Sequence, residues 1–327
     1  GLEVDLAFAN EIREDLLQQA AAHNDAWNEN TMALSMPMQE LAQDDWLLSQ
    51  LPKLDVLEMG LPCSGSSKAG VSKLGLTKME DHKDVGHLVY AALAILSKTQ
   101  PAVVLLENVP EYAKTGSSQI LRHQLRDMGY QTHEAILSGK DFGCIENRIR
   151  WCLVATTQGL SFDFDQIKPV VSVVRKLKDY LDPAVLDTDP SYREMTYLKE
   201  KEKRDIAAEK GFRMQMLTED SSSVPTLRKG YKKGGSTDPQ LLHPTNPDLS
   251  RLLNTKEHAK IKGVPYTLIE GLSETKGHEL LGQGIVYNPF KQVGAKIGAS
   301  LNQLIDSVPT LYQEDDDEDR YSPSFCG

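Results

Sequence analysis

Four consecutive apolar residues, Val103-Val104-Leu105-Leu106, constrain the fold of this chain more than any other stretch. The run does not alternate polar with apolar positions, so we expect a strand with both faces covered, as in a parallel sheet. Short apolar runs at Leu54–Met59 and Trp151–Ala155 have a similar character, and helical patterns at Asp84–Lys98 and Ser118–Met128 lie between the three runs. This alternation predicts an α/β fold, with right-handed crossovers and helices on both faces of the sheet.

Candidate chemical groups lie where these runs begin or end. The first run leads into Gly60-Leu61-Pro62-Cys63, a turn that presents a thiol, and the central run is followed by the carboxylate of Glu107. Arg148 and Arg150 flank Ile149 just ahead of the third run, so in an extended segment both would face one side. Open α/β sheets place their chemistry in loops at the carboxyl ends of strands. A lone cysteine in such a loop is nevertheless more often inert than catalytic.

The size and composition of the chain restrict its class. With 327 residues, 40% of them hydrophobic, it can form one large domain and one smaller one. No apolar stretch approaches the length of a membrane-spanning helix and the start has no signal-peptide pattern, so we expect a soluble cytoplasmic protein. The four cysteines lack CxxC pairing and histidine partners at metal-ligand spacing, which predicts no disulfide framework and no metal site. We expect a monomer.

The distribution of charge matters more than its sum. The net charge is −11, but six acidic residues form one run, Glu314–Asp319, which we expect to be a solvated, disordered tail. Nucleic-acid binding would then depend on a local basic surface. The segment Arg228–Gly235 is basic and rich in glycine and contains Tyr231, which suits contact with a phosphate backbone. The candidate contacts are Arg228, Lys229, Lys232 and Lys233. The run Lys199–Arg204 has mixed sign and is typical of a solvated helix face.

The order of several short motifs is specific. Pro62-Cys63, with Ser67 four residues beyond the thiol, is followed by Glu107-Asn108-Val109 and then by Arg148-Ile149-Arg150 ahead of a strand. In this order and at these separations, the motifs resemble those of the DNA (cytosine-5)-methyltransferase family of bacteria and phage. The stretch Gly282–Pro289 is similar to the last motif of that family.

The resemblance covers residues 4 to about 304, except for a central variable region. It implies a Rossmann-like sheet of the S-adenosylmethionine-dependent methyltransferase type, with helices on both faces, and a smaller target-recognition domain. The helix expected at Arg251–Ala259 would support that domain, and the chain would then return to the sheet. The expected segments are the catalytic domain at 1–157, the target-recognition domain at 158–248, the catalytic return at 249–306 and the acidic tail at 307–327.

The resemblance also implies a role for each matched residue. The Cys63 thiolate would add to C6 of a cytosine flipped out of double-stranded DNA, so that C5 can accept a methyl group. Glu107 would hydrogen-bond N3 and the exocyclic amine. The two arginines would hold O2 and favour the thiolate, with Arg150 acting more as a structural brace than Arg148, and Ser67 would contact the DNA. The base that removes the C5 proton is not identified by the motifs.

S-adenosylmethionine is the cofactor that the resemblance implies. Glu11 and Ile12 follow an expected strand that starts at Leu2, and they match residues that contact the ribose and adenine; without the resemblance, Glu11 could equally be a surface residue starting the helix Arg13–His23. A third strand is expected within Met32–Leu41, where no cofactor contact can be placed. The other matched cofactor positions are Gly60, Pro62, Leu88, Gln283 and Ile285.

Two alternatives stay open at this point. The first motif of the family, a strand with a Phe-x-Gly-x-Gly turn, is expected ahead of Leu2, so we expect that residue 1 is not the natural start. One alternative is a catalytically inactive DNA-binding remnant. Both departures from the family pattern, the first motif and Gln283 in place of Asn, concern the binding of the cofactor. An RNA cytosine-5 methyltransferase is the other, although the long variable segment Gln158–Asn246 favours reading of DNA. Restriction-modification is the biological setting that the resemblance implies.

Overall fold

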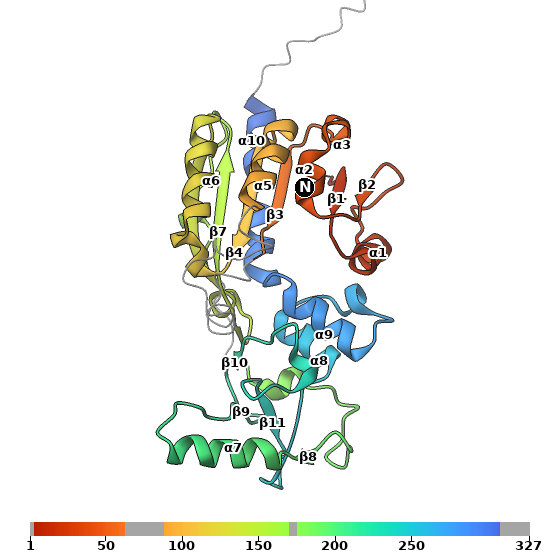
Figure 1. Ribbon diagram of the computed structural model, residues 1–327, viewed down its shortest axis with the longest axis vertical. Helices are drawn as coiled ribbons and strands as arrows, with labels where there is room; N and C mark the ends of the chain where they lie inside the picture. The colour runs from red at the N-terminus through yellow and green to blue at the C-terminus, as the bar shows by residue number, and fades with distance from the viewer. Residues whose placement is uncertain (1–2, 63–87, 170–174, 308–327) are drawn as a thin grey trace, which may run out of the picture.

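The computed structural model describes residues 3–62, 88–169 and 175–307. The larger lobe of the protein contains a four-stranded sheet in the order β3-β4-β7-β5 (Figure 1). These strands are β3 (Val56–Gly60), β4 (Val103–Asn108), β5 (Gln131–Ser138) and β7 (Ile149–Thr156). The three apolar runs of the sequence form β3, β4 and β7, as predicted, whereas β5 carries no comparable run.

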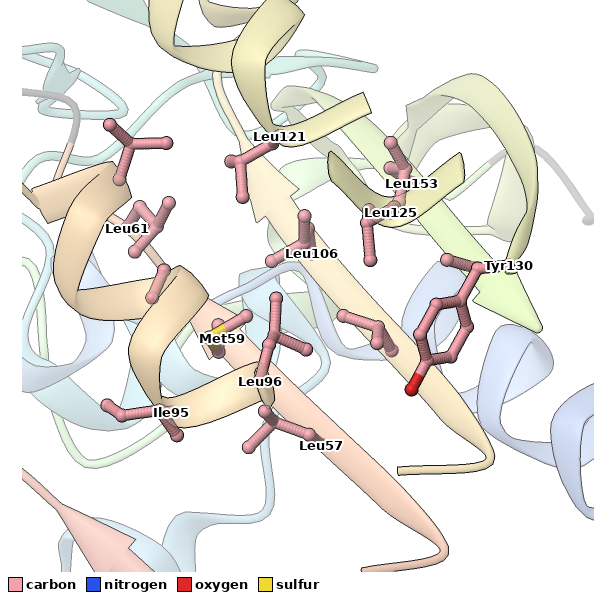
Figure 2. Packing of buried hydrophobic residues seen from close by; sticks show 14 of the residues in the cluster. Leu57, Met59, Leu61, Ile95, Leu96, Leu106, Leu121, Leu125, Tyr130 and Leu153 are labelled. Atoms are coloured by element: carbon pink, nitrogen blue, oxygen red, sulfur yellow. The ribbon is translucent and has the colours of Figure 1, made fainter. Parts of the chain in front are cut away.

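Helices cover both faces of this sheet, which confirms the expected α/β architecture. The covering helices are α5 (Leu88–Thr99), α6 (Gly116–Asp127) and α10 (Tyr287–Ser307). Val104 and Leu106 of β4 point to the α5 and α6 side, and Val103 and Leu105 point to α10. Figure 2 shows the first cluster around Leu106, including Ile95, Leu96, Leu121 and Leu125. The two predicted helices are thus present, and residues 84–87 of the first prediction lie outside the described residues.

Strand direction departs from the prediction of an all-parallel sheet. β3 and β4 are parallel, but β7 lies between β4 and β5 and is antiparallel to both. Residues 139–148 alone connect β5 to β7, and they are too few for the helical crossover that a parallel pair requires. The chain therefore turns back on itself, and the apolar run of β7 reflects burial on both faces rather than direction.

The N-terminal strands form a separate two-stranded parallel sheet. The elements of this region are β1 (Phe8–Asn10), α1 (Glu14–His23), β2 (Met32–Leu34), α2 (Met38–Gln43) and α3 (Asp45–Gln50). α1 agrees with the predicted helix, but the first strand, predicted to start at Leu2, is shorter than expected: residues 3–7 are not part of it and β1 begins at Phe8. The third strand, predicted within Met32–Leu41, ends at Leu34, because Pro37 stands at the N-cap of α2. Phe8 and Met32 pack against the core of the larger lobe.

A second lobe, residues 175–284, lies below the larger one in Figure 1. It holds a four-stranded sheet in the order β8-β12-β11-β9 and a core of its own that includes Leu177, Leu241 and Tyr231. Its elements are β8 (Arg193–Glu194), α7 (Thr196–Ala207), β9 (Met216–Leu217), β11 (Gln240–Leu242), β12 (Leu249–Arg251), α8 (Thr255–Lys262) and α9 (Glu274–Gln283). The mixed-charge run Lys199–Arg204 forms part of α7, as predicted, with only Leu198 of that helix buried.

The connection back to the larger lobe differs in detail from the prediction of a helix over Arg251–Ala259. Arg251 ends β12, and α8 begins only at Thr255, because Asn254 and Glu257 form a capping box at its N-terminus. The chain then returns to the sheet through α10. Within the described ranges, no helix combines the length and the apolar character needed to span a membrane.

Candidate active site

The ends of β3 and β4 bring the expected catalytic segments together. Gly60, at the end of β3, lies opposite Glu107 on β4. The buried side chain of Asn108 donates a hydrogen bond of 2.9 Å to the carbonyl oxygen of Leu61. Leu61 and Pro62 directly precede Cys63. Asn108 therefore holds the segment that leads into the cysteine loop beside Glu107. Asn108 stands within the Glu-Asn-Val motif, but the motif alone did not predict a role for this side chain. Cys63 itself and Ser67 lie outside the described residues.

Glu107 and Arg150 form an ion pair at this sheet end. The Nε atom of Arg150 lies 2.6 Å from Oε1 of Glu107, and the two side chains are only 14% and 15% exposed. An ion pair at this distance, with both side chains largely buried, restricts the orientation of both groups. The pair thus presents a carboxyl group and a guanidinium side by side at the end of β4.

Arg148 points elsewhere. The chain bends before β7, where the Arg148 backbone N–H bonds to the Glu146 carbonyl, and only Arg150 lies within the strand. The Arg148 side chain is 3% exposed and donates to the carbonyl oxygen of Gly282 at 3.2 Å. The two arginines therefore do not face one side, as an extended segment would place them. Sequence spacing gave no sign of this bend.

The other described thiols are buried and poorly suited to nucleophilic chemistry. Burial raises the pKa of Cys144 to about 11 and raises the pKa of Cys152 even further. Both groups are therefore protonated near neutral pH, and a thiol is a much weaker nucleophile than a thiolate. The described residues thus offer no rival to Cys63. They also contain no group of three or more His, Cys, Asp or Glu side chains arranged to hold a metal ion.

The candidate cofactor residues come from three places in the chain. Ile12, Gly60, Pro62 and Gln283 are exposed, and Glu11 is half-buried, with its Oε1 accepting a hydrogen bond from the backbone of Arg13. Leu88 is buried at the start of α5, and Ile285 is half-buried against the core beneath α10. These two residues would therefore pack beneath a ligand site and support it, rather than line its exposed surface.

An ion pair brings the end of β1 to α9. The Nη1 atom of Arg13 lies 3.0 Å from Oε1 of Glu279, one helical turn before Gln283. Asp15 also pairs with Lys276 on the same helix. Both contacts come from the start of α1, and Figure 1 shows α1 close to the region of α9. Residues from opposite ends of the sequence, beside Ile12 and Gln283, are thus held in one neighbourhood.

The basic segment Arg228–Gly235 forms an exposed turn on the second lobe. Arg228 pairs with Asp238 at 2.7 Å, and Lys232 lies 3.7 Å from Glu274. Lys229 and Lys233 are exposed. A cavity of about 270 Å³ lies next to the turn, and Lys232 and Lys233 are among its lining residues. Tyr231 is buried, and its hydroxyl donates to the carbonyl oxygen of Pro239, so it supports the turn and is not available for base stacking.

Nearly the whole chain is similar in sequence to known proteins. A family model described as C-5 cytosine-specific DNA methylase matches residues 3–299. Type II methyltransferase M.NlaX of Neisseria lactamica is 25% identical over 272 residues, which is 82% of this chain and 82% of that protein. Type II methyltransferase M1.ScrFI of Lactococcus lactis subsp. cremoris is 26% identical over 256 residues; the match covers 76% of this chain but only 63% of that protein.

The fold is also similar to solved structures. The crystal structure of the S. pombe Dnmt2 methyltransferase matches with a TM-score of 0.70 and 19% identity. The match covers 91% of this chain and 92% of that one. At this level of identity the likeness concerns the fold, and it extends over both lobes.

Proposed function

The chain belongs to the C-5 cytosine-specific DNA methylase family, and from that premise we propose that it methylates cytosine in double-stranded DNA through a thiolate at Cys63. The observation that carries the proposal is the Glu107–Arg150 pair, held at the end of β4 directly beside the base of the cysteine loop. Two of the groups that cytosine activation requires, a carboxyl and a guanidinium, thus lie next to Leu61 and Pro62, which directly precede the Cys63 thiol in the sequence.

The chemistry follows from the weak reactivity of C5. Addition of a thiolate to C6 turns C5 into an enamine carbon, which can attack an electrophilic methyl group. Glu107 would hydrogen-bond N3 and the exocyclic amine, where the ring becomes more basic as the thiolate adds. After transfer, removal of the C5 proton would allow the thiolate to leave and restore the aromatic ring.

The geometry supports an exchange of roles between the two arginines. Arg150 touches Glu107 and is placed to hold O2 of a base that is bound to that carboxyl. Arg148, which is bound to the Gly282 carbonyl, is the structural brace in this proposal. The assignment is the reverse of the one that the motif match implies.

The family is dependent on S-adenosylmethionine, which when bound supplies the electrophilic methyl group. We assign its ribose and adenine to Glu11 and Ile12 and a further polar contact to Gln283. The exposure of Ile12, Gly60, Pro62 and Gln283 fits this assignment, as does the ion pair that ties the end of β1 to α9.

Double-stranded DNA would lie between the lobes. C6 of a stacked cytosine is out of reach, so the base must leave the helix to meet Cys63. Lys229 and Lys233 are exposed and would contact phosphates, while residues 158–248 would read the target sequence. By analogy with the type II relatives, we infer a role in restriction-modification.

A trapping experiment tests the proposal. Duplex DNA that carries 5-fluorocytosine should form a denaturation-stable adduct with the protein in the presence of S-adenosylmethionine, because fluorine at C5 prevents the final elimination. Cys63→Ala should abolish the adduct, and Cys144→Ala, which removes a buried thiol, should retain it. Binding of the duplex without any adduct would instead identify a non-catalytic DNA-binding protein. An adduct with RNA alone would change the substrate class.

A further inference from the structure

The segment Val224–Lys229 leaves the second lobe and reaches the catalytic strands. Its first residues form β10 (Val224–Pro225), which pairs in parallel with β6 (Glu146–Asn147), immediately before Arg148. The Val224 backbone N–H donates to the Ile145 carbonyl at 2.9 Å. The contact is therefore made by backbone pairing and not only by side chains.

Two side-chain hydrogen bonds extend this contact. The Thr226 hydroxyl donates to the Asn147 carbonyl at 2.9 Å. The Leu227 backbone N–H donates to Oε1 of Glu146 at 3.0 Å, and Glu146 is fully buried. A buried polar oxygen is costly unless it accepts a hydrogen bond, so the bond from Leu227 favours this position of the segment.

On its other side, the segment lies against Gly282 at the end of α9. A Cβ atom on Gly282 would stand 2.2 Å from the backbone N of Lys229 and 2.3 Å from the carbonyl carbon of Arg228. Real Cβ atoms do not approach backbone atoms this closely, so only glycine allows the segment to rest on the helix here.

The same glycine is bound to the catalytic strand region. Its carbonyl oxygen accepts the hydrogen bond from Arg148, two residues before Arg150. The preceding carbonyl, of Leu281, accepts a hydrogen bond from the buried Lys262. Cations are favoured at the C-terminal carbonyls of a helix, which fixes the end of α9 at this point. Glu146, Arg148 and Gly282 thus form one continuous arrangement, which we call the Gly282 seat.

We propose that the Gly282 seat is a positioning device: it holds the basic turn, Arg228–Gly235, at a set place relative to the Glu107–Arg150 pair. A duplex bound by that turn would then present one base to Glu107. Under the proposed function, no member of the seat contacts the base or the cofactor, so its members are positioning residues. The inference rests on the proposed function, because it supposes that the duplex is bound by the second lobe and that chemistry takes place at Glu107.

The test separates binding from chemistry. Gly282→Ala should slow single-turnover adduct formation on 5-fluorocytosine duplex by about 10–100-fold, because small misplacements cost this much in rate, while the Kd for the duplex stays within about threefold. The matched control is Gly294→Ala on α10, where an added Cβ meets nothing within 4 Å. That variant should keep both values. An unchanged adduct rate in folded Gly282→Ala would refute the seat, as would a loss of rate and binding in proportion to the unfolded fraction.

A second variant covers the case in which Gly282→Ala does not fold. Thr226→Val removes one hydrogen bond with little change in shape, and it should slow adduct formation by about 3–10-fold with duplex binding retained. In the same variant, hydrogen exchange should accelerate at the Val224 and Leu227 amides but not in β4. Unchanged exchange and rate would overturn the inference. If the wild-type protein forms no adduct, the proposed function itself fails, which is a different result from an active wild type with unaffected variants.

Discussion

At the scale of single residues, the Glu107–Arg150 pair does two things at once. Each group is largely screened from water by the strands around it, so the ion pair is stronger than a surface salt bridge. Each also keeps hydrogen-bonding atoms that a bound base can use, since a guanidinium has five N–H donors and a carboxyl has two oxygens. The pair is therefore both a structural contact and a preorganised site.

Replacement of the carboxyl group tests this view. Glu107→Gln keeps the shape of the side chain and should lower the methyl-transfer rate by about 10²–10³-fold, because the amide cannot take part in proton transfer at N3. Steady-state kinetics with tritiated S-adenosylmethionine would measure the change. Glu134→Gln is the matched control: Glu134 pairs with Arg122 at the same distance of 2.6 Å, away from the strand ends, and its loss should leave the rate unchanged.

The role of a site residue could be predicted from the sequence where a motif specifies its chemistry. It could not be predicted where the backbone conformation decides which way the side chain points. Glu107 stands at the strand end that the apolar run predicts. Arg148 was expected to face the same side as Arg150, but a bend in the backbone turns its side chain away. The contacts of Glu146 and Gly282 join segments far apart in the chain, and one sequence contains no signal for such pairings.

At the scale of elements, the apolar runs predicted the buried strands β4 and β7 but not their direction, and the prediction of a buried β3 was only half right, because alternate residues of that strand are exposed. β4 and β7 have similar composition, yet β7 runs antiparallel to β4. Direction is set by the length of the connection, which becomes visible only once β5 is recognised as a strand. β5 has mainly half-buried and exposed positions, so it lacked the unbroken apolar run that would have predicted it.

The buried position of β7 leads to a stability prediction. Leu153 is fully buried in the hydrophobic cluster on the α5 and α6 side of the sheet, so Leu153→Ala should lower the free energy of unfolding by about 2–5 kcal/mol. Leu186, which is 65% exposed, is the control: Leu186→Ala should change stability by less than about 0.5 kcal/mol. Urea unfolding followed by circular dichroism measures both, and a loss below about 1 kcal/mol for Leu153→Ala would contradict the packing described for β7.

At the scale of the whole molecule, a net charge of −11 requires that DNA binding be local. Two of the four cations in the basic turn are engaged by carboxylates, which leaves Lys229 and Lys233 as the expected phosphate contacts. The double variant Lys229→Ala/Lys233→Ala should weaken duplex binding and reduce the slope of log K against log salt concentration by about 2. Lys98→Ala, an exposed lysine at the end of α5, should leave the slope as it is. An unchanged slope in the double variant would mean that Lys229 and Lys233 do not contact the phosphates and that the DNA binds to another surface.

The junction of α8 and α9 should make the stability of the whole protein depend on pH. The Nδ1 atoms of two fully buried histidines, His258 and His278, lie 3.0 Å apart, so only one proton fits between them. The surrounding charges are those of Lys262, Arg148 and Glu274. Burial, together with the nearby cations Lys262 and Arg148, lowers the pKa of His258 well below its usual value.

The sign of the effect follows from this lowered pKa. Below pH ~6.5 the unfolded chain binds a proton at His258 that the folded protein refuses, so stability should fall by up to about 1.4 kcal/mol per pH unit as the pH decreases. The pKa of Lys262 is lowered to about 7, so below pH 6 this lysine is largely protonated in both states and adds little to the slope. Urea unfolding between pH 5 and 6, below the range in which Lys262 titrates in the folded protein, would measure the decline that is due to His258. His258→Gln should flatten it, whereas His123→Gln, at an exposed position on α6, should not. If the wild-type decline persists in His258→Gln, acid sensitivity arises elsewhere in the molecule and the buried histidine pair does not control it.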